Sequence, residues 1–360
     1  MAPNSLKEFA KKEQAALKHL TPIKIIIPIT IGVMVLVYLT WRDFDPNYIY
    51  QIQWNNHTLF WTAMAVLMVL LRHMAYAYRL RKLTENFLSW MKSIELVFLW
   101  EFSSAISPTS LGGSVVAFFL LSKERLKAAR TTAVVLYSII LDTMFFAVAV
   151  PVFYLLLGVS WIRPGAQNFA DLGGWGISLL SFYIFMTLYG AFFFIGVFLH
   201  PELIKNFLVW LSRFKWLRKY RRQLSETGDD VILTSQKIKK KPIGYHLSVF
   251  GATALGWICR FLLLNFLIIA FVPKVSADLL PQTVLVGRSL AIYLFMAFMP
   301  TPGSSGIAEF VFNGFLSDYI PASLSMIVAS VWRLLSYYFY LISGVIIIPL
   351  WLKRVLSRDR

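Results

Sequence analysis

Long apolar stretches separated by short polar ones dominate the hydropathy pattern of this chain. Because the hydrocarbon core of a bilayer is about 30 Å thick, an α-helix needs roughly 20 apolar residues to cross it. Stretches of about that length predict six transmembrane helices, at about residues 23–41, 57–78, 128–157, 177–199, 243–272 and 323–351. The pattern therefore predicts an all-α integral membrane protein.

Two further apolar stretches, at about residues 93–122 and 283–316, are too long for one span and are broken in the middle. Proline ends a helix because it lacks the backbone N–H, and glycine adopts turn conformations that are closed to other residues. Each stretch is therefore predicted to form two half-helices joined by a turn. The predicted turn residues are Pro108, Gly112, Gly113, Pro302, Gly303 and Gly306.

The basic residues are concentrated on one side of the predicted membrane. Of the 35 Lys and Arg residues, only Arg42, Arg163 and Lys274 fall in loops of the other side. Basic loops mark the cytoplasmic side of a membrane protein. The charges therefore predict a multi-pass protein of the cell (inner) membrane, with cytoplasmic N- and C-termini.

This topology divides the chain into three parts. They are a cytoplasmic amphipathic segment at 1–22, a transmembrane domain at 23–352 with a basic cytoplasmic loop at 200–242, and a basic cytoplasmic tail at 353–360. Amphipathic basic segments of this kind bind anionic lipid headgroups at a membrane surface.

The flanking charges orient the two broken stretches. The first stretch has basic residues on both flanks, whereas the second is flanked by Asp278 and Asp318. The two stretches are therefore predicted to enter the membrane from opposite sides as re-entrant helical hairpins. Since each is followed by a helix that crosses the membrane, the arrangement predicts an inverted repeat, which in secondary transporters surrounds the transported species near the midplane.

Composition supports the membrane class and excludes several functions. Apolar residues make up 58% of the chain and charged residues 15%, whereas a soluble domain has about 45–50% and about 25%. The formal charge of +17 follows the membrane flanks, so we expect membrane lipids as partners and no nucleic acid. The single Cys259, five scattered histidines and absence of a phosphate-binding loop motif predict no metal site and no cofactor.

Ionisable residues inside apolar stretches mark functional sites because they are costly to bury. Arg260 and Arg333 lie too deep to reach the headgroup region, so they either line a polar cavity or pair with a buried acid. Arg288 is closer to the surface and is expected to extend toward it. Glu309 follows the second turn, where it caps a helix, pairs with an arginine or carries a proton. The predicted substrate-binding or translocation residues are Glu309, Arg333, Arg260, Asp142, Glu101, Arg288, Ser304 and Ser305.

Two motifs resemble those of the flippase-like transmembrane domain of lysylphosphatidylglycerol synthases. The stretch Pro300-Thr301-Pro302-Gly303-Ser304-Ser305-Gly306-Ile307-Ala308-Glu309 is similar to the family's Pro-x-Pro-Gly-x-x-Gly-x-x-Glu motif. The run from Pro108 to Gly113 is similar to an earlier family motif, but Gly112-Gly113-Ser114 stands where many members have Gly-Glu followed by Arg. The resemblance covers most of the chain and implies lipid transport. The soluble aminoacyl-transfer domain of two-domain members is not expected after Trp351.

These features predict a transporter or flippase that moves an amphipathic lipid, with an anionic phosphate-bearing headgroup, between leaflets. One alternative is a non-transporting membrane partner whose basic inner loop binds an enzyme of cell-envelope or glycolipid synthesis. Another is an intramembrane enzyme acting on lipid-linked substrates, although no recognisable catalytic set occurs, so we expect a protein that is not an enzyme. The sequence does not indicate an oligomeric state.

Overall fold

A computed structural model describes residues 54–107, 110–159, 161–214, 218–298, 304, 312 and 314–358. These residues lie within one unit of the chain, Pro46–Arg360, and form helices without any strand among them. The predicted amphipathic segment and the first predicted span lie outside the described residues. The same holds for Pro108, Pro302, Gly303, Ser305, Gly306 and Glu309.

Six described helices are long and apolar enough to cross a membrane. They are Asn56–Leu83, Ala129–Leu157, Gly174–Leu199, Ile243–Phe271, Leu279–Ala297 and Ala322–Val355. Five of them match predicted spans, so the prediction of an all-α membrane protein is confirmed. The remaining helix, Leu279–Ala297, begins just before the second broken stretch, where one arm of a hairpin was predicted.

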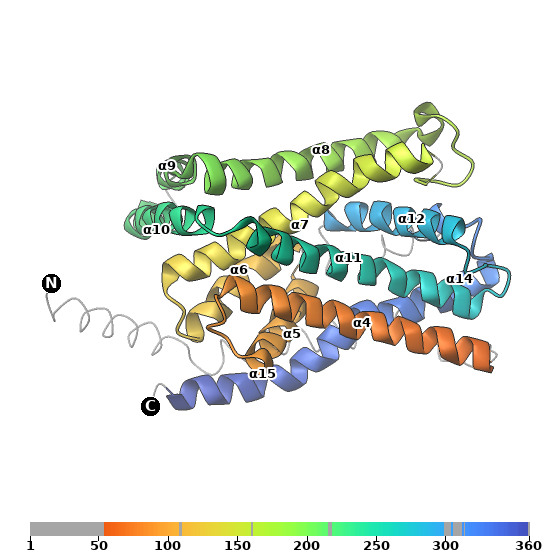
Figure 1. Cartoon of the computed structure of the whole chain (residues 1–360), viewed down its shortest axis with the longest axis horizontal. Helices are drawn as coiled ribbons and strands as arrows, with labels where there is room; N and C mark the ends of the chain where they lie inside the picture. Colours follow the sequence, from red (N-terminus) through yellow and green to blue (C-terminus); the bar gives the residue numbers. More distant parts are fainter. Residues whose placement is uncertain are drawn as a thin grey trace, which may run out of the picture. The chain divides into compact units, whose positions relative to one another are not determined.

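Figure 1 shows the long helices running in the same general direction. They are α4 (Asn56–Leu83), α7 (Ala128–Leu157), α8 (Gly174–Phe194), α11 (Ile243–Phe271), α12 (Leu279–Ala297), α14 (Ala322–Arg333) and α15 (Phe339–Arg358). The 3-10 helix η1 (Phe169–Leu172) precedes α8, which continues into the π-helix η2 (Ile195–Leu199). A second π-helix, η5 (Leu334–Tyr338), joins α14 to α15. The wider turns of η5 interrupt the last span in its middle.

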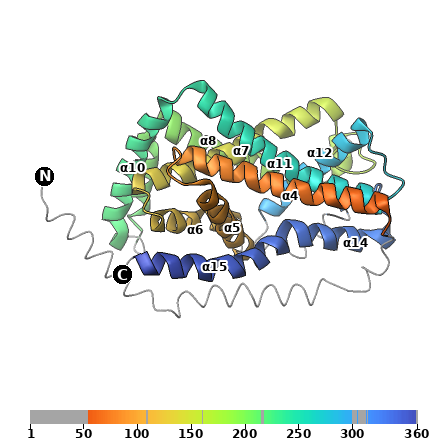
Figure 2. The same cartoon turned by 60° about the horizontal axis from the view of Figure 1, so that its bottom comes forward.

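The first broken stretch forms a helical hairpin of α5 (Trp90–Ile106) and α6 (Ser110–Lys123). Lys92 near the start of α5 lies 3.2 Å from the carboxylate of Glu124, directly after α6, so both arms return to the same end. Near the tip, a Cβ on Gly113 would lie 1.8 Å from Ser104 Oγ. Glycine therefore permits the close approach of the two arms. Figure 2 shows α5 between α15 and α4, and α5 packs on both.

The second broken stretch brings α12 beside the segment 314–320. Arg288 of α12 donates to the backbone carbonyl of Phe315 at 3.0 Å and pairs with Asp318. The rings of Phe295 and Phe315 lie 5.6 Å apart. The chain thus turns back along α12, while the insertion of either hairpin into the membrane from one side stays a prediction.

The predicted basic loop 200–242 folds into helices at one end of the bundle. They are α9 (Pro201–Leu211), η3 (Arg218–Tyr220) and α10 (Arg221–Lys239). In Figure 1, α9 and α10 lie at the end where α15 finishes. α10 packs on α9 and on the beginning of α7. Nearby, Glu85 joins α7 and the start of α11 through ion pairs with Arg130 at 2.9 Å and Lys241 at 2.5 Å.

Two apolar clusters form the core of the described bundle. The first is centred on α11, α12 and α14, where Leu264, Ile268 and Leu290 are completely buried. The second joins α5, α6, α7 and α10, with Leu121 and Val134 buried. Residues of both clusters border the same cavity.

Candidate functional site

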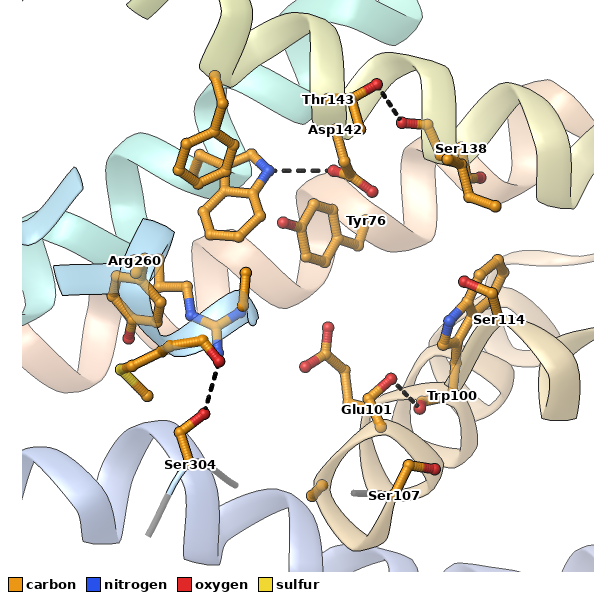
Figure 3. Close-up of a pocket in the computed structure, with 18 of the residues that line it drawn as sticks. Tyr76, Trp100, Glu101, Ser107, Ser114, Ser138, Asp142, Thr143, Arg260 and Ser304 are labelled. Atoms are coloured by element: carbon orange, nitrogen blue, oxygen red, sulfur yellow. Dashed lines mark hydrogen bonds between the residues drawn. The ribbon is translucent and has the colours of Figure 1, made fainter. Parts of the chain in front are cut away.

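A cavity of about 550 Å³ lies where the two apolar clusters meet. Its walls come from α4, α5, α6, α7, α8, α11 and α12, together with Ser304, Arg333, η5 and the start of α15. Figure 3 shows part of this lining. The volume falls within the roughly 300–1,000 Å³ typical of small-molecule sites. Both broken stretches contribute to the walls, as an inverted repeat around one site requires.

Five of the predicted site residues line this one cavity. They are Glu101, Asp142, Arg260, Ser304 and Arg333. They come from segments that are far apart in the sequence, so the fold and not the local sequence brings them together. Their role in binding a substrate stays a prediction.

Glu101 of α5 is held by a buried arginine of α4. Arg72, which is 4% exposed, places Nη2 at 2.7 Å from the carboxylate of Glu101 and donates from Nη1 to the hydroxyl of Tyr340 at 2.7 Å. The Arg72 guanidinium also lies over the ring of Tyr76. A buried charge that is paired and hydrogen-bonded in this way is tolerated at membrane depth.

Asp142 of α7 forms the second ion pair of the cavity wall. Arg79 of α4 lies 2.8 Å from Asp142 Oδ1 and donates to Thr253 Oγ1 at 3.1 Å. The indole of Trp257 donates to the same Asp142 oxygen at 3.0 Å, as Figure 3 shows. The Asp142 side chain remains 29% exposed. Its carboxylate is therefore neutralised from behind and still faces the cavity.

Arg260 of α11 differs from the α4 arginines, because the described residues give its guanidinium neither an ion pair nor a hydrogen bond. It lies instead 4.5 Å from the ring centre of Tyr293 and 5.4 Å from that of Trp257. Its Nε is buried without an acceptor, and the hydroxyl of Tyr293 is likewise unsatisfied. Buried donors without partners are rare in folded proteins. A ligand acceptor in the cavity would satisfy the guanidinium.

Arg333 stands at the junction of α14 and the π-helix η5. It is 5% exposed, and its guanidinium lies 4.5 Å from the ring centre of Tyr337. The hydroxyl of Tyr337 donates to the carbonyl of Ala105 at 3.1 Å, in the last turn of α5. The carbonyls of a last turn have no partner within their own helix. The π-helix thus connects the last span to the tip of the first hairpin, and π-bulges are frequent at functional sites.

Several cavity hydroxyls are already used as donors. Ser104 donates to the carbonyl of Trp100 at 3.1 Å, Ser107 to Ser103 at 2.7 Å and Thr143 to Ile139 at 2.8 Å. Ser304, which has a φ of +56°, donates to the carbonyl of Met296 at 2.8 Å. Each of these hydroxyl oxygens keeps lone pairs that accept hydrogen bonds.

Arg288 does not line the cavity, and the prediction that its side chain extends toward the surface is wrong. The residue is 4% exposed, pairs with Asp318 and lies over the ring of Tyr319. The segment after the second hairpin folds back over α12 and supplies these partners. Arg288 therefore joins α12 to the segment 314–320 that returns along it.

Sequence reasoning missed Arg72 and Arg79, which it counted among the basic residues of the cytoplasmic side. The predicted span included Arg72 and ended at residue 78, whereas α4 continues to Leu83 and buries both arginines. A signal was present: Arg72, Tyr76 and Arg79 follow at intervals of four and three residues, which places them on one face of a helix. A face with two charges and a tyrosine is compatible with burial only if acids lie opposite.

Within the described ranges, no cluster of three or more His, Cys, Asp or Glu side chains is arranged to hold a metal ion. Cys259 is buried and unpaired. The chemistry that the described cavity offers is therefore that of arginine, carboxylate, hydroxyl and aromatic groups.

Comparison with known proteins gives one family and one curated relative. The family model described as the lysylphosphatidylglycerol synthase TM region matches residues 25–344. A protein of Archaeoglobus fulgidus, described as a UPF0104 membrane protein, is 26% identical over 287 residues, which cover 74% of this chain and 79% of the relative. No solved structure matches. The family match includes both broken stretches and every described residue that lines the cavity.

Proposed function

Since the chain belongs to the family of the lysylphosphatidylglycerol synthase transmembrane region, we propose that it moves an amphipathic lipid between the leaflets of the cell membrane. The transported lipid carries an anionic, phosphate-bearing headgroup. In this proposal both termini are cytoplasmic, and the two hairpins enter the membrane from opposite sides.

The observation that carries the proposal is Arg260, which forms no ion pair or hydrogen bond with a described residue, in a cavity formed by both broken stretches. Guanidinium groups bind phosphate oxygens with strong, charge-assisted hydrogen bonds. The carboxylates of Glu101 and Asp142 are already neutralised by Arg72 and Arg79. The positive charge of Arg260 is therefore available to an anionic ligand.

The size and position of the cavity suit a headgroup whose acyl chains stay in the bilayer. Phe185 of α8 lines the cavity and is also 58% exposed on the outer surface of the bundle. The cavity therefore reaches the surface along α8, which is the helix least buried among the six candidate spans. A headgroup entering there leaves its chains against the apolar side chains of α8.

Reconstituted liposomes test this function. Fluorescent phosphatidylglycerol is placed in both leaflets, and the fraction that an external reductant quenches is followed over time. The wild-type protein is expected to expose the inner-leaflet lipid. Arg260→Gln is expected to slow this movement at least tenfold, since a charge-assisted hydrogen bond contributes about 1.5–3 kcal/mol.

The matched control is Arg222→Gln. Arg222 is an arginine of the basic loop with an 85% exposed side chain, far from the cavity lining. Its replacement is expected to leave lipid movement unchanged. If no phosphate-bearing lipid, including phosphatidylglycerol, phosphatidic acid and a polyprenyl phosphate, moves faster than in empty liposomes, the proposed function is wrong.

A further inference from the structure

We propose that the cavity selects a phosphodiester headgroup carrying uncharged hydroxyls, such as a polyol or a sugar, over one carrying an ammonium group. This inference rests on the proposed function and names the substrate class of the same site. It follows from the acceptors that two carboxylates and three hydroxyls present to the cavity, opposite the donor groups of Arg260.

Three hydroxyls in the walls formed by α5 and α7 offer acceptors to a ligand. Ser104, Ser107 and Thr143 each have one hydroxyl proton, and each gives it to a carbonyl three or four residues earlier in its own helix. The lone pairs of these oxygens remain available to accept hydrogen bonds from a ligand. At these three hydroxyls a ligand must therefore bring its own donor.

The two carboxylates add further acceptors to the same walls. One oxygen of Asp142 accepts hydrogen bonds from both Arg79 and Trp257, and one oxygen of Glu101 accepts a hydrogen bond from Arg72. The side chains of Asp142 and Glu101 are 29% and 20% exposed. Each carboxylate therefore keeps acceptor capacity that a ligand hydroxyl can use, and hydrogen bonds to a charged acceptor are the stronger kind.

The donor side of the cavity lies at α11. Arg260 has no acceptor among the described residues, and its guanidinium has five N–H groups that suit a phosphate. Figure 3 shows Arg260 on one side of the cavity, with Glu101, Ser107 and Ser114 of the first hairpin on the other. A phosphate at Arg260 thus directs the rest of the headgroup toward the acceptor walls.

Charge decides between a hydroxyl and an ammonium group as the donor. An ammonium group is attracted most strongly by an uncompensated negative charge, and both cavity carboxylates are paired within 2.8 Å to arginines of α4. The remaining charge of Arg260 repels a second cation. Neutral hydroxyl donors meet the same acceptors without this repulsion.

Lipid binding to the purified protein in detergent tests the proposal, with quenching of tryptophan fluorescence as the readout, because Trp100 and Trp257 line the cavity. Four probes are compared: phosphatidylglycerol, a glucosyl phosphoprenol, phosphatidylmethanol and phosphatidylethanolamine. Phosphatidylmethanol keeps the phosphodiester and its charge but has no hydroxyl. The first two probes distinguish a polyol source from a sugar source of the hydroxyls.

At least one hydroxyl-bearing probe is expected to bind about tenfold or more tightly than phosphatidylmethanol and phosphatidylethanolamine. Ser104→Ala is expected to reduce that preference roughly threefold to tenfold without changing the affinity for phosphatidylmethanol. Ser181→Ala is the matched control, because Ser181 makes the same backbone hydrogen bond on exposed α8 outside the cavity.

Equal affinity for phosphatidylglycerol, glucosyl phosphoprenol and phosphatidylmethanol would overturn the hydroxyl preference and leave the proposed function standing. Tighter binding of phosphatidylethanolamine than of both hydroxyl-bearing probes would overturn it as well. No binding of any probe, together with no lipid movement in liposomes, would overturn the proposed function itself.

Discussion

Helices α4 and α11 pack along each other, yet they present their buried arginines in different ways. The approach is close, since a Cβ on Gly256 of α11 would lie 2.6 Å from the ring of Tyr76 on α4. On α4, Arg72 and Arg79 are each fixed to a carboxylate. On α11, Arg260 lies against aromatic rings with no acidic partner among the described residues.

This difference separates two uses of a buried cation. Arg72 and Arg79 connect α4 to α5 and α7, and their charges are neutralised by ion pairs within the protein. Arg260 stands at the same cavity, but no described carboxylate forms an ion pair with it. We therefore expect loss of an α4 arginine to reduce stability and loss of Arg260 to reduce ligand binding.

The largest effect is expected for Arg72→Met. It leaves Glu101 as a buried carboxylate without its partner, and breaking a buried pair costs about 3–5 kcal/mol. Thermal unfolding of the purified protein in detergent should therefore begin at a clearly lower temperature. The double variant Arg72→Met with Glu101→Gln is expected to recover most of the lost stability. If Arg72→Met alone unfolded at the same temperature as the wild type, the structural role of the Arg72–Glu101 pair would be contradicted.

A smaller effect is expected for Asp142→Asn. The amide oxygen still accepts the hydrogen bond from Trp257, and Arg79 still donates to the hydroxyl of Thr253. The expected loss of unfolding free energy is therefore about 1.5–3 kcal/mol. The higher exposure of Asp142, 29% against 20% for Glu101, also lowers the cost. The same unfolding measurement, made beside Glu101→Gln, would contradict this ranking if Asp142→Asn were the more damaging change.

Arg260→Gln sharpens the comparison, because its effect on stability is expected to be only about 1 kcal/mol. What it loses within the protein is the cation–π contact with Tyr293 and Trp257. Its unfolding temperature should therefore stay close to that of the wild type while lipid movement falls. A large loss of stability would mean that Arg260 belongs with the structural arginines of α4.

The smallest effect is expected at Glu85, an ion-paired carboxylate outside the spans. A hydrogen bond from Lys241 lowers the pKa of Glu85 below its ordinary value, with the charges of Lys241 and Arg130 acting in the same direction. Stability from this group is therefore present above the unfolded pKa and is lost as the pH falls through the folded one. Since the side chain is 39% exposed, we expect about 1 kcal/mol or less.

Unfolding of wild type and Glu85→Gln at several pH values checks this expectation. The two proteins should differ at pH 7 and converge toward pH 3. A difference that grows as the pH falls would contradict the sign of the pKa shift.

The sequence was sufficient to predict the helical membrane fold, because hydrophobic length is a strong signal. It also singled out Glu101, Asp142, Arg260 and Arg333, since charges in apolar stretches are rare. The partners of these charges were not predictable, because they depend on the rotation and depth of α4 relative to α5 and α7. Charges near the end of a predicted span are counted with the cytoplasmic side, and Arg72 and Arg79 were therefore not recognised as buried.

Arg288 illustrates the opposite error. Its position along α12 indicated access to the surface, but burial depends on the segment 314–320, whose return over α12 is a tertiary feature. The re-entrant insertion of α12 as one arm of a hairpin stays a prediction, since α12 is 19 residues long and apolar enough to cross a membrane. Length alone therefore does not distinguish a span from one arm of a hairpin.

The most direct test of the central claim is an electron cryomicroscopy structure in nanodiscs made of phosphatidylglycerol. The account predicts density for a phosphate within hydrogen-bond distance of the Arg260 guanidinium, inside the cavity between α5, α7 and α11. The glycerol of that lipid should extend toward Glu101 and Asp142, and its chains toward Phe185. A cavity without lipid density, with Arg260 paired to a carboxylate of the protein, would contradict the account.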